Sequence, residues 1–245
     1  MTIVGFDTSM AITSACVLSA DGRSVSTAPP PAERLFERPD HSAELLPTLA
    51  SLLEEAGVAW SDVRLIAVGI GPGTFTGLRI GVATARALGS ALGVDLAPVS
   101  SLAALAAGAA RWSGEDGALL LPLIDARRRQ VFAALYDEGP ALSPRWGPVA
   151  LGREELIERV SGHASKHRTS ILATGDWALE SRADLEAAGL VVPPADPGLH
   201  SVDALDLCRL AQATPPVPAD EVRPVYVRQP DAEINLEKSH GLGQS

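Results

Sequence analysis

The stretch GIGPGTFTGLRIG, residues 69–81, contains five glycines and a proline within thirteen residues. It follows the apolar run LIAV and precedes a long alanine-rich segment, an order that predicts a strand, a tight turn and a helix. Glycine-rich turns at the start of a helix often hold phosphate, because the free backbone amides of the first helical turn attract anions. The spacing of the glycines tests that function.

Neither of the two common phosphate-binding motifs fits this turn. A Walker A loop needs Lys and then Ser or Thr after its last glycine, and Leu78 and Arg79 occupy those places. A dinucleotide-binding turn needs a third glycine three residues after Gly73, where the sequence has Thr76. What remains is a helix N-terminus whose free amides could receive an anion.

A second pattern in the same segment is a ridge of small residues along the predicted helix. Small residues recur there every four positions, at Gly77, Gly81, Ala85, Gly89 and Gly93. Glycine inside a helix costs about 1 kcal/mol relative to alanine, so the ridge needs a structural reason. The close approach of another helix would supply one, and the spacing leaves open whether that helix belongs to the same chain or to a partner.

Outward from this turn, strands and helices follow the same order in both halves of the chain, βββαβαβα. In the first half, strands are expected at 2–7, 13–20, 23–29, 63–70 and 94–99, and helices at 41–56, 78–93 and 102–112. In the second half, strands are expected at 119–125, 130–137, 145–151, 170–176 and 190–192, and helices at 153–160, 177–188 and 202–213.

This repeated order predicts an α/β fold of two lobes. It is the plan of the actin, Hsp70 and sugar kinase (ASKHA) superfamily, a ribonuclease H-like fold that binds ATP between its lobes. The analogy concerns the fold alone, since one fold serves many functions. We expect an N-terminal lobe at residues 1–113, a C-terminal lobe at residues 114–230 and a flexible tail at residues 231–245.

The first hairpin of each lobe is where that superfamily grips phosphate. Here the first one reads Asp7-Thr8-Ser9 without a glycine, and the second begins with Asp125 and has an arginine in place of the usual glycine-rich turn. Two interpretations follow: a working phosphate site, or a relic hairpin whose aspartate caps backbone amides.

The few lysines and the acidic net charge exclude several kinds of chemistry. The chain has 20 basic and 30 acidic residues, a net charge of −10, and its lysines are Lys166 and Lys238 alone. Residues 1–165 therefore hold no lysine for a Schiff base or a phosphate loop. An acidic chain is also a poor ligand for nucleic acid on its own, so a basic partner would have to supply that contact.

The N-terminus and the cysteines indicate the compartment. No charged segment followed by an apolar run opens the chain, and no apolar run is long enough for a membrane helix. Cys16 and Cys208 each lie in an apolar setting, typical of reduced core residues. We expect a soluble, cytoplasmic protein with no membrane contact.

Five segments resemble the TsaB (YeaZ) family in order and spacing. They are HSAELLP at 41–47, GPGTFTGLRIG at 71–81, PVSSLAALA at 98–106, DARRRQVF at 125–132 and PVYVR at 224–228. The resemblance implies a non-catalytic subunit that binds and activates TsaD, joined by the ATPase TsaE. TsaD transfers threonylcarbamoyl to adenosine 37 of tRNAs that read codons starting with A.

The resemblance also implies what this chain lacks. In TsaD, two histidines that follow the matching turn, helix and strand bind the catalytic metal, and here Ser101 and Leu105 stand in their places. Leucine binds no metal and serine is a poor ligand for iron or zinc, so we expect no metal site and no catalytic residues. The resemblance implies no cofactor in the isolated chain and leaves open ATP or ADP at the junction with TsaD.

In the family, the helix that begins HSE and the helix after the glycine-rich turn bind TsaD, and in its absence the same surface forms a homodimer. Contact with tRNA would then be indirect, through TsaD. The matching residues here are His41, Glu44, Leu45, Thr48, Leu52, Gly77, Arg79, Gly81, Val82, Ala83 and Arg86. The alternative function is an ATP-dependent phosphotransferase or ATPase, which would depend on Asp7 and Asp125.

Overall fold

The computed structural model describes the chain except residues 30, 38–39, 114–116, 140–141, 168–169 and 229–245. The predicted tail at 231–245 therefore lies outside the described residues. The described strands are β1 (Ile3–Asp7), β2 (Ser14–Leu18), β3 (Ser24–Ser26), β4 (Leu65–Gly69), β5 (Leu96–Val99), β6 (Leu119–Asp125), β7 (Gln130–Asp137), β8 (Pro144–Gly152) and β9 (Ile171–Thr174). The helices are α1 (His41–Ala56), α2 (Phe75–Leu92), α3 (Ser101–Ser113), α4 (Arg153–His167), α5 (Asp176–Glu180), α6 (Arg182–Ala187), α7 (Pro197–His200) and α8 (Ala204–Ala211), with short 3-10 turns η1 (Ala32–Phe36) and η2 (Trp60–Asp62).

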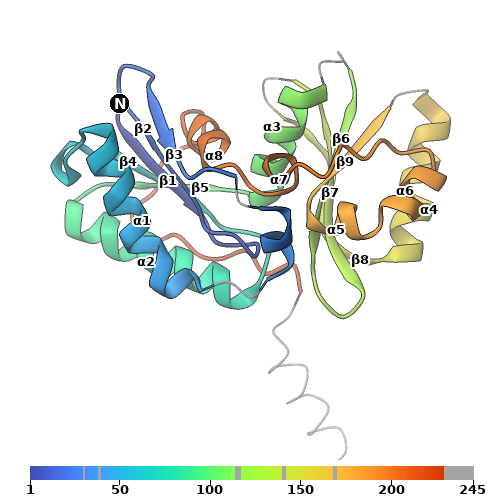
Figure 1. The fold of residues 1–245 in the computed structure, drawn as a ribbon, viewed down its shortest axis with the longest axis horizontal. Coiled ribbons are helices and arrows are strands. Elements are labelled where there is room, and N and C mark those ends of the chain that lie inside the picture. Colours follow the sequence, from blue (N-terminus) through green and yellow to red (C-terminus); the bar gives the residue numbers. More distant parts are fainter. Residues whose placement is uncertain (30, 38–39, 114–116, 140–141, 168–169, 229–245) are drawn as a thin grey trace, which may run out of the picture.

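The strands form two sheets, one in each half of the chain (Figure 1). The first has the order β3-β2-β1-β4-β5, and the second has the order β8-β7-β6-β9. β1 pairs antiparallel with β2 and parallel with β4, and β6 likewise pairs antiparallel with β7 and parallel with β9. β1 and β4 are buried throughout, because both faces of the sheet are covered where these strands lie.

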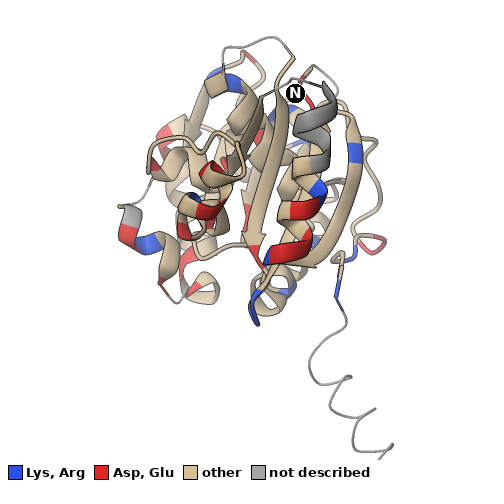
Figure 2. Ribbon diagram, turned by 90° about the vertical axis from the view of Figure 1, so that its right-hand side faces the viewer, with Lys and Arg blue, Asp and Glu red and all other residues tan. Residues whose placement is uncertain are grey.

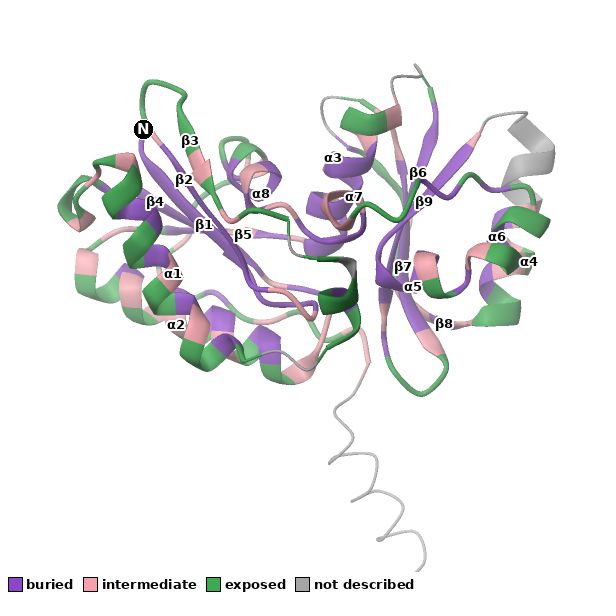
Figure 3. Ribbon diagram, in the orientation of Figure 1, coloured by how far each residue is buried: buried purple, intermediate pink, exposed green. Residues whose placement is uncertain are grey.

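The helices and sheets stack in five layers. α1 and α2 cover the outer face of the first sheet, and α4, α5 and α6 cover the outer face of the second. Between the sheets lie α3 and α8, whose apolar side chains form one continuous core with both inner faces. Figure 3 shows this burial along the strands and along the inner sides of the helices.

The two central helices cross over between the halves. α3 ends the first half of the sequence but packs on β6 and β9, and α8 ends the second half but packs on β1 and β2. Arg111 of α3 joins the two helices, since its guanidinium reaches Asp206 at 2.6 Å and Asp203 at 3.1 Å. The proposed boundary at residue 113 therefore separates the two sheets but not the helices packed on them.

The two-lobed α/β class is confirmed, and the order βββαβαβα is confirmed in the first half. The second half departs from that order in three places, one of which is the additional short helix α7. The strand expected at 190–192 is a single bridge from Val191 to Leu172, and the helix expected at 177–188 breaks at Ser181 into α5 and α6. A three-residue apolar run is too short to specify a full strand, so tertiary packing decides its pairing.

Charge and the last described segment complete the fold. Figure 2 shows acidic residues on several helices, in keeping with the net charge of −10. The segment after α8 returns to the first sheet, where Val217 bridges Leu96 and the Val225 amide donates to the Ile70 carbonyl at 2.8 Å.

No helix in the described part of the chain is long and apolar enough to span a membrane.

Candidate functional site

The end of β1 and the glycine-rich turn form one closed hydrogen-bond network. Asp7 is buried, and its Oδ1 accepts hydrogen bonds from the Ser9 amide at 2.7 Å and the Ser9 hydroxyl at 2.6 Å. Its Oδ2 accepts one from the Ser101 hydroxyl at 2.6 Å, which in turn accepts one from the Gly71 amide. Both carboxylate oxygens therefore have partners within the chain.

Thr8 follows Asp7 and fills the space above the first turns of α2. Its hydroxyl donates to the Gly77 carbonyl at 2.8 Å. A Cβ on Gly77 would lie 1.9 Å from the Thr8 carbonyl oxygen, and one on Gly81 would lie 2.3 Å from the Thr8 hydroxyl. These two glycines are required because the first hairpin lies directly on α2.

The rest of the ridge also faces the chain's own interior. A Cβ on Gly89 would lie 2.4 Å from the Leu96 side chain and 3.0 Å from that of Ala219, and Ala85 is completely buried. Gly93 is the C-cap of α2 in a left-handed conformation, with φ +67°. The ridge therefore lies against a hairpin and the segment after α8, so the neighbour that the spacing left open is this chain itself and not another helix.

The structure divides the predicted contact residues of α1 and α2 into two groups. Those whose side chains or backbone are buried within the chain are His41, Leu45, Leu52, Gly77, Gly81 and Val82. Those that remain accessible are Glu44, Thr48, Arg79, Ala83 and Arg86. α1 and α2 lie side by side on the first sheet, so the second group shares one outer surface, which we call the α1/α2 face (Figure 1).

His41 holds the start of α1 to the loop after β1. Its Nε2 donates to the Met10 carbonyl at 3.0 Å, which leaves Nδ1 to accept from the Thr13 hydroxyl at 2.7 Å. Burial lowers the pKa of this imidazole, because the charged form would lose its hydration. His41 therefore acts as a neutral anchor of the helix in this conformation.

An aromatic cluster lies at the start of α2, beside the α1/α2 face. The rings of Phe75 and Tyr226 are 5.1 Å apart, and the Arg79 guanidinium lies 3.8 Å from the centre of the Phe75 ring. The Nε of Arg79 also donates to the Tyr226 hydroxyl at 3.3 Å. Arg79 was predicted as a contact residue, whereas Phe75 and Tyr226 were not, although the PVYVR segment contains Tyr226.

The two positions compared with metal-binding histidines lie in the core. Ser101 is the first residue of α3 and donates to Asp7, whereas Leu105 is buried one turn further along the same helix. Within the described residues, no group of three or more His, Cys, Asp or Glu side chains is arranged to hold a metal ion. Ser101 thus has a structural partner in place of a ligand.

The matching edge of the second sheet contains two aspartates. Asp125 is partly exposed at the end of β6 and accepts from the Arg127 amide at 2.7 Å and its guanidinium at 3.0 Å. Asp176 is buried behind it and accepts from the Asp125 amide at 2.9 Å. Burial raises the pKa of Asp176 to about 7. Asp176 was expected at the end of a strand, and the sequence pattern assigns it no role.

Comparisons with known proteins cover most of the chain. Residues 37–143 match the family model described as TsaD, tRNA N6-adenosine threonylcarbamoyltransferase. The tRNA threonylcarbamoyladenosine biosynthesis protein TsaB of Bacillus subtilis is 39% identical over 42% of this chain, and the match spans only 43% of that relative. The Escherichia coli protein of the same name is 29% identical over 77% of this chain and 81% of its own length.

A solved structure extends the likeness to the whole fold. YeaZ from Pseudomonas aeruginosa has a TM-score of 0.73 and 30% identity, covering 92% of this chain and 99% of its own. This chain belongs to the TsaB (YeaZ) family.

Proposed function

We propose that this protein takes part in tRNA threonylcarbamoyladenosine biosynthesis as a non-catalytic subunit that binds TsaD, with TsaE joining the pair. Family membership and the printed names of its relatives support the pathway. The protein would bind through the α1/α2 face, and without TsaD the same face would join two copies. The tRNA would be bound by TsaD, and any ATP or ADP would lie at the junction of the two subunits.

The observation that carries the proposal is the apolar character around the α1/α2 face. Seven large hydrophobic side chains are exposed among the described residues, and four belong to η1, α1 or the segment that packs on α2: Phe36, Leu46, Val225 and Tyr226. Phe36 is 58% exposed and Leu46 is 50% exposed. Exposed apolar side chains that gather on one side of a protein often mark a protein interface.

The shape of α2 adds to this argument. Its accessible side contains Ala83 and Ala87, whose small side chains let a partner helix approach closely, flanked by the Arg79 and Arg86 guanidiniums. Arginine and aromatic residues are enriched at interfaces because they combine apolar area with directional hydrogen bonds. Arg79 already lies against Phe75 and Tyr226, so this part of the surface is ordered before a partner binds.

The non-catalytic role rests on Ser101, Leu105 and Asp7. A serine and a buried leucine supply no metal ligands where the resemblance to TsaD implies histidines. The alternative function, ATP hydrolysis or phosphate transfer, would use Asp7 at the first hairpin. Its two oxygens already accept hydrogen bonds from Ser9 and Ser101, which disfavours that alternative.

The test is reconstitution from purified parts. TsaD, TsaE, unmodified tRNA and threonylcarbamoyl-adenylate are combined with and without this protein, and threonylcarbamoyladenosine in the tRNA is measured. We expect modification to depend on this protein and the protein alone to modify no tRNA and hydrolyse no ATP. Equal modification without it would reject the subunit role. ATP hydrolysis by the isolated protein that Asp7→Ala abolishes would instead support the alternative.

A further inference from the structure

The tip of the β6–β7 hairpin has an uncommon backbone. Arg127, Arg128 and Arg129 all adopt left-handed conformations, with φ values of 62°, 54° and 62°. For residues other than glycine this region costs free energy, because Cβ crowds the backbone. The tip is nevertheless well built: the Ala126 amide donates to the Gln130 carbonyl at 3.1 Å, and the Gln130 amide donates to the Arg127 carbonyl at 3.0 Å.

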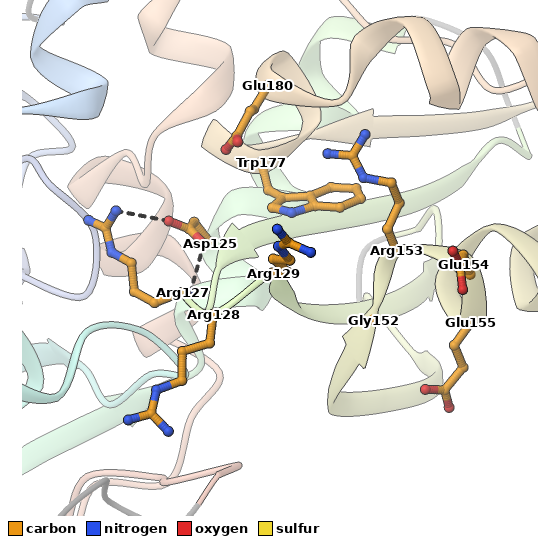
Figure 4. Close-up of a pocket in the computed structure, with 10 residues that line it drawn as sticks. All are labelled: Asp125, Arg127, Arg128, Arg129, Gly152, Arg153, Glu154, Glu155, Trp177 and Glu180. Atoms are coloured by element: carbon orange, nitrogen blue, oxygen red, sulfur yellow. Dashed lines mark hydrogen bonds and ion pairs between the residues drawn. The ribbon is translucent and has the colours of Figure 1, made fainter.

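A left-handed tip sends successive side chains in different directions. In Figure 4, Arg127 extends to one side, where it pairs with Asp125, while Arg128 points away from the sheet. Arg129 points toward Trp177 of α5. Glycine would adopt this backbone without the steric cost that an arginine has there.

Arg129 lines a cavity of about 860 Å³ on the second lobe, apart from the α1/α2 face. Arg153, the first residue of α4, also lines it, and its guanidinium lies 5.4 Å from the centre of the Trp177 ring. The cavity also contains Asp125, Gly152 and the rim carboxylates Glu154, Glu155 and Glu180. Its size is within the range of small-molecule sites, on the order of 300 to 1,000 Å³.

The two guanidiniums that face Trp177 retain hydrogen-bond donors. Arg153 pairs with Asp184 through Nη1. Arg129 forms no hydrogen bond or ion pair with any residue in the part of the chain that the structure describes. Two guanidiniums beside a buried ring can bind an oxyanion such as phosphate, because each planar guanidinium can donate two parallel hydrogen bonds.

We propose that this cavity binds the phosphate group of a small molecule between Arg129 and Arg153. The three glutamates on the rim favour a compact ligand, because they would repel an extended polyanion such as a nucleic-acid backbone. The same glutamates could accept hydrogen bonds from hydroxyl or amino groups on the remainder of the ligand. Every residue that lines the cavity belongs to the second lobe, whereas the proposed contact with TsaD lies on the first.

Isothermal titration of the full-length protein tests the site, with inorganic phosphate and AMP as separate probes at constant ionic strength. Binding of inorganic phosphate alone would indicate a site for the free ion, and tighter binding of AMP would indicate a phosphate monoester. Arg129→Gln removes the charge and Arg129→Gly also relieves the backbone. Arg145→Gln is the matched control, since Arg145 lies on β8 of the same lobe, outside the cavity, and pairs with Asp137.

We expect wild type and Arg145→Gln to bind at least one probe with the same affinity. Both Arg129 variants should bind that probe at least tenfold more weakly. The unliganded melting temperature of Arg129→Gly should equal or exceed that of wild type, because glycine fits the left-handed backbone. The proposal would be overturned if wild type bound neither inorganic phosphate nor AMP. So would Arg129 variants that bind as wild type does.

Discussion

The Ser101 hydroxyl donates a 2.6 Å hydrogen bond to the buried carboxylate of Asp7, joining residues 94 positions apart. Asp7 ends β1 of the first sheet, and Ser101 begins α3, which packs on the second sheet. One side-chain contact therefore links the first hairpin, where the superfamily binds phosphate, to the helix that crosses to the second sheet. It also occupies the position where the resemblance to TsaD implies a metal ligand.

Replacing Ser101 with alanine should destabilise the protein. The change leaves Asp7 Oδ2 and the Gly71 amide without partners in a buried site, a cost of about 1 to 3 kcal/mol. Urea unfolding followed by circular dichroism measures it. Ser51→Ala, at an exposed position of α1, is the control and should change the unfolding free energy by less than about 0.5 kcal/mol. If both variants change the unfolding free energy equally, the hydrogen bond between Ser101 and Asp7 does not stabilise the fold.

Gly77→Ala should be strongly destabilising because its Cβ would collide with the backbone of Thr8. Overpacking of this kind costs about 1 to 3 kcal/mol or more. Gly108→Ala in α3 is a matched control, since its Cβ meets only Asp206 Oδ2 at 3.5 Å and alanine favours the helix by about 1 kcal/mol. If Gly77→Ala unfolds at the same urea concentration as wild type, the ridge does not pack on the first hairpin.

His41 should make stability fall in mild acid. Its pKa is lowered in the folded protein by burial, so below about pH 6.5 the unfolded chain binds a proton that the folded chain resists. The contribution of His41 is complete above that pH and decreases as pH falls toward the lowered value. His41→Gln should flatten this part of the stability curve, measured by urea unfolding between pH 7.5 and pH 5. His200 is buried with a lowered pKa too, so part of the slope should remain. An unchanged slope would show that His41 titrates normally.

Asp176→Asn should stabilise the protein at neutral pH. The folded-state pKa of Asp176 is raised to about 7, so the folded chain retains a proton that the unfolded chain releases near pH 4. Stability is therefore lost as pH rises from about 4 to 7, by up to roughly 4 kcal/mol. Asparagine does not titrate and can still accept from the Asp125 and Trp177 amides. The advantage of the variant should grow from pH 4 to pH 7 and then remain constant; an advantage that does not change with pH would contradict the assignment.

Much of the fold could be predicted because its signals are local. Apolar runs that end in aspartate gave β1 and β6, and the Gly57 and Gly93 C-caps gave the ends of α1 and α2. Local patterns do not show which segment of the chain packs against each surface. The spacing of Gly77 and Gly81 indicates that something approaches α2 closely, but only the tertiary structure identifies Thr8 as that neighbour.

The site was harder to predict for the same reason. His41 and Leu45 belong to a segment that resembles a partner-binding helix, yet both side chains are buried in this chain. For a helix that contacts the core on one side and a partner on the other, periodicity alone does not say which side is which. Arg153 and Trp177 are distant from Arg129 in sequence and meet only through the pairing of β7 with β8 and β6 with β9. No short-range pattern predicts a cavity built in this way.

We propose that the α1/α2 face binds TsaD, and a binding titration of purified TsaD against this protein tests this directly. Ala83→Arg places a large charged side chain at an exposed position of that face, and Ala187→Arg places the same side chain at an exposed position on α6 of the other lobe. We predict a stable complex with wild type and with Ala187→Arg, and at least tenfold weaker binding by Ala83→Arg. The absence of a complex with wild type, or equal affinities for all three proteins, would contradict the claim.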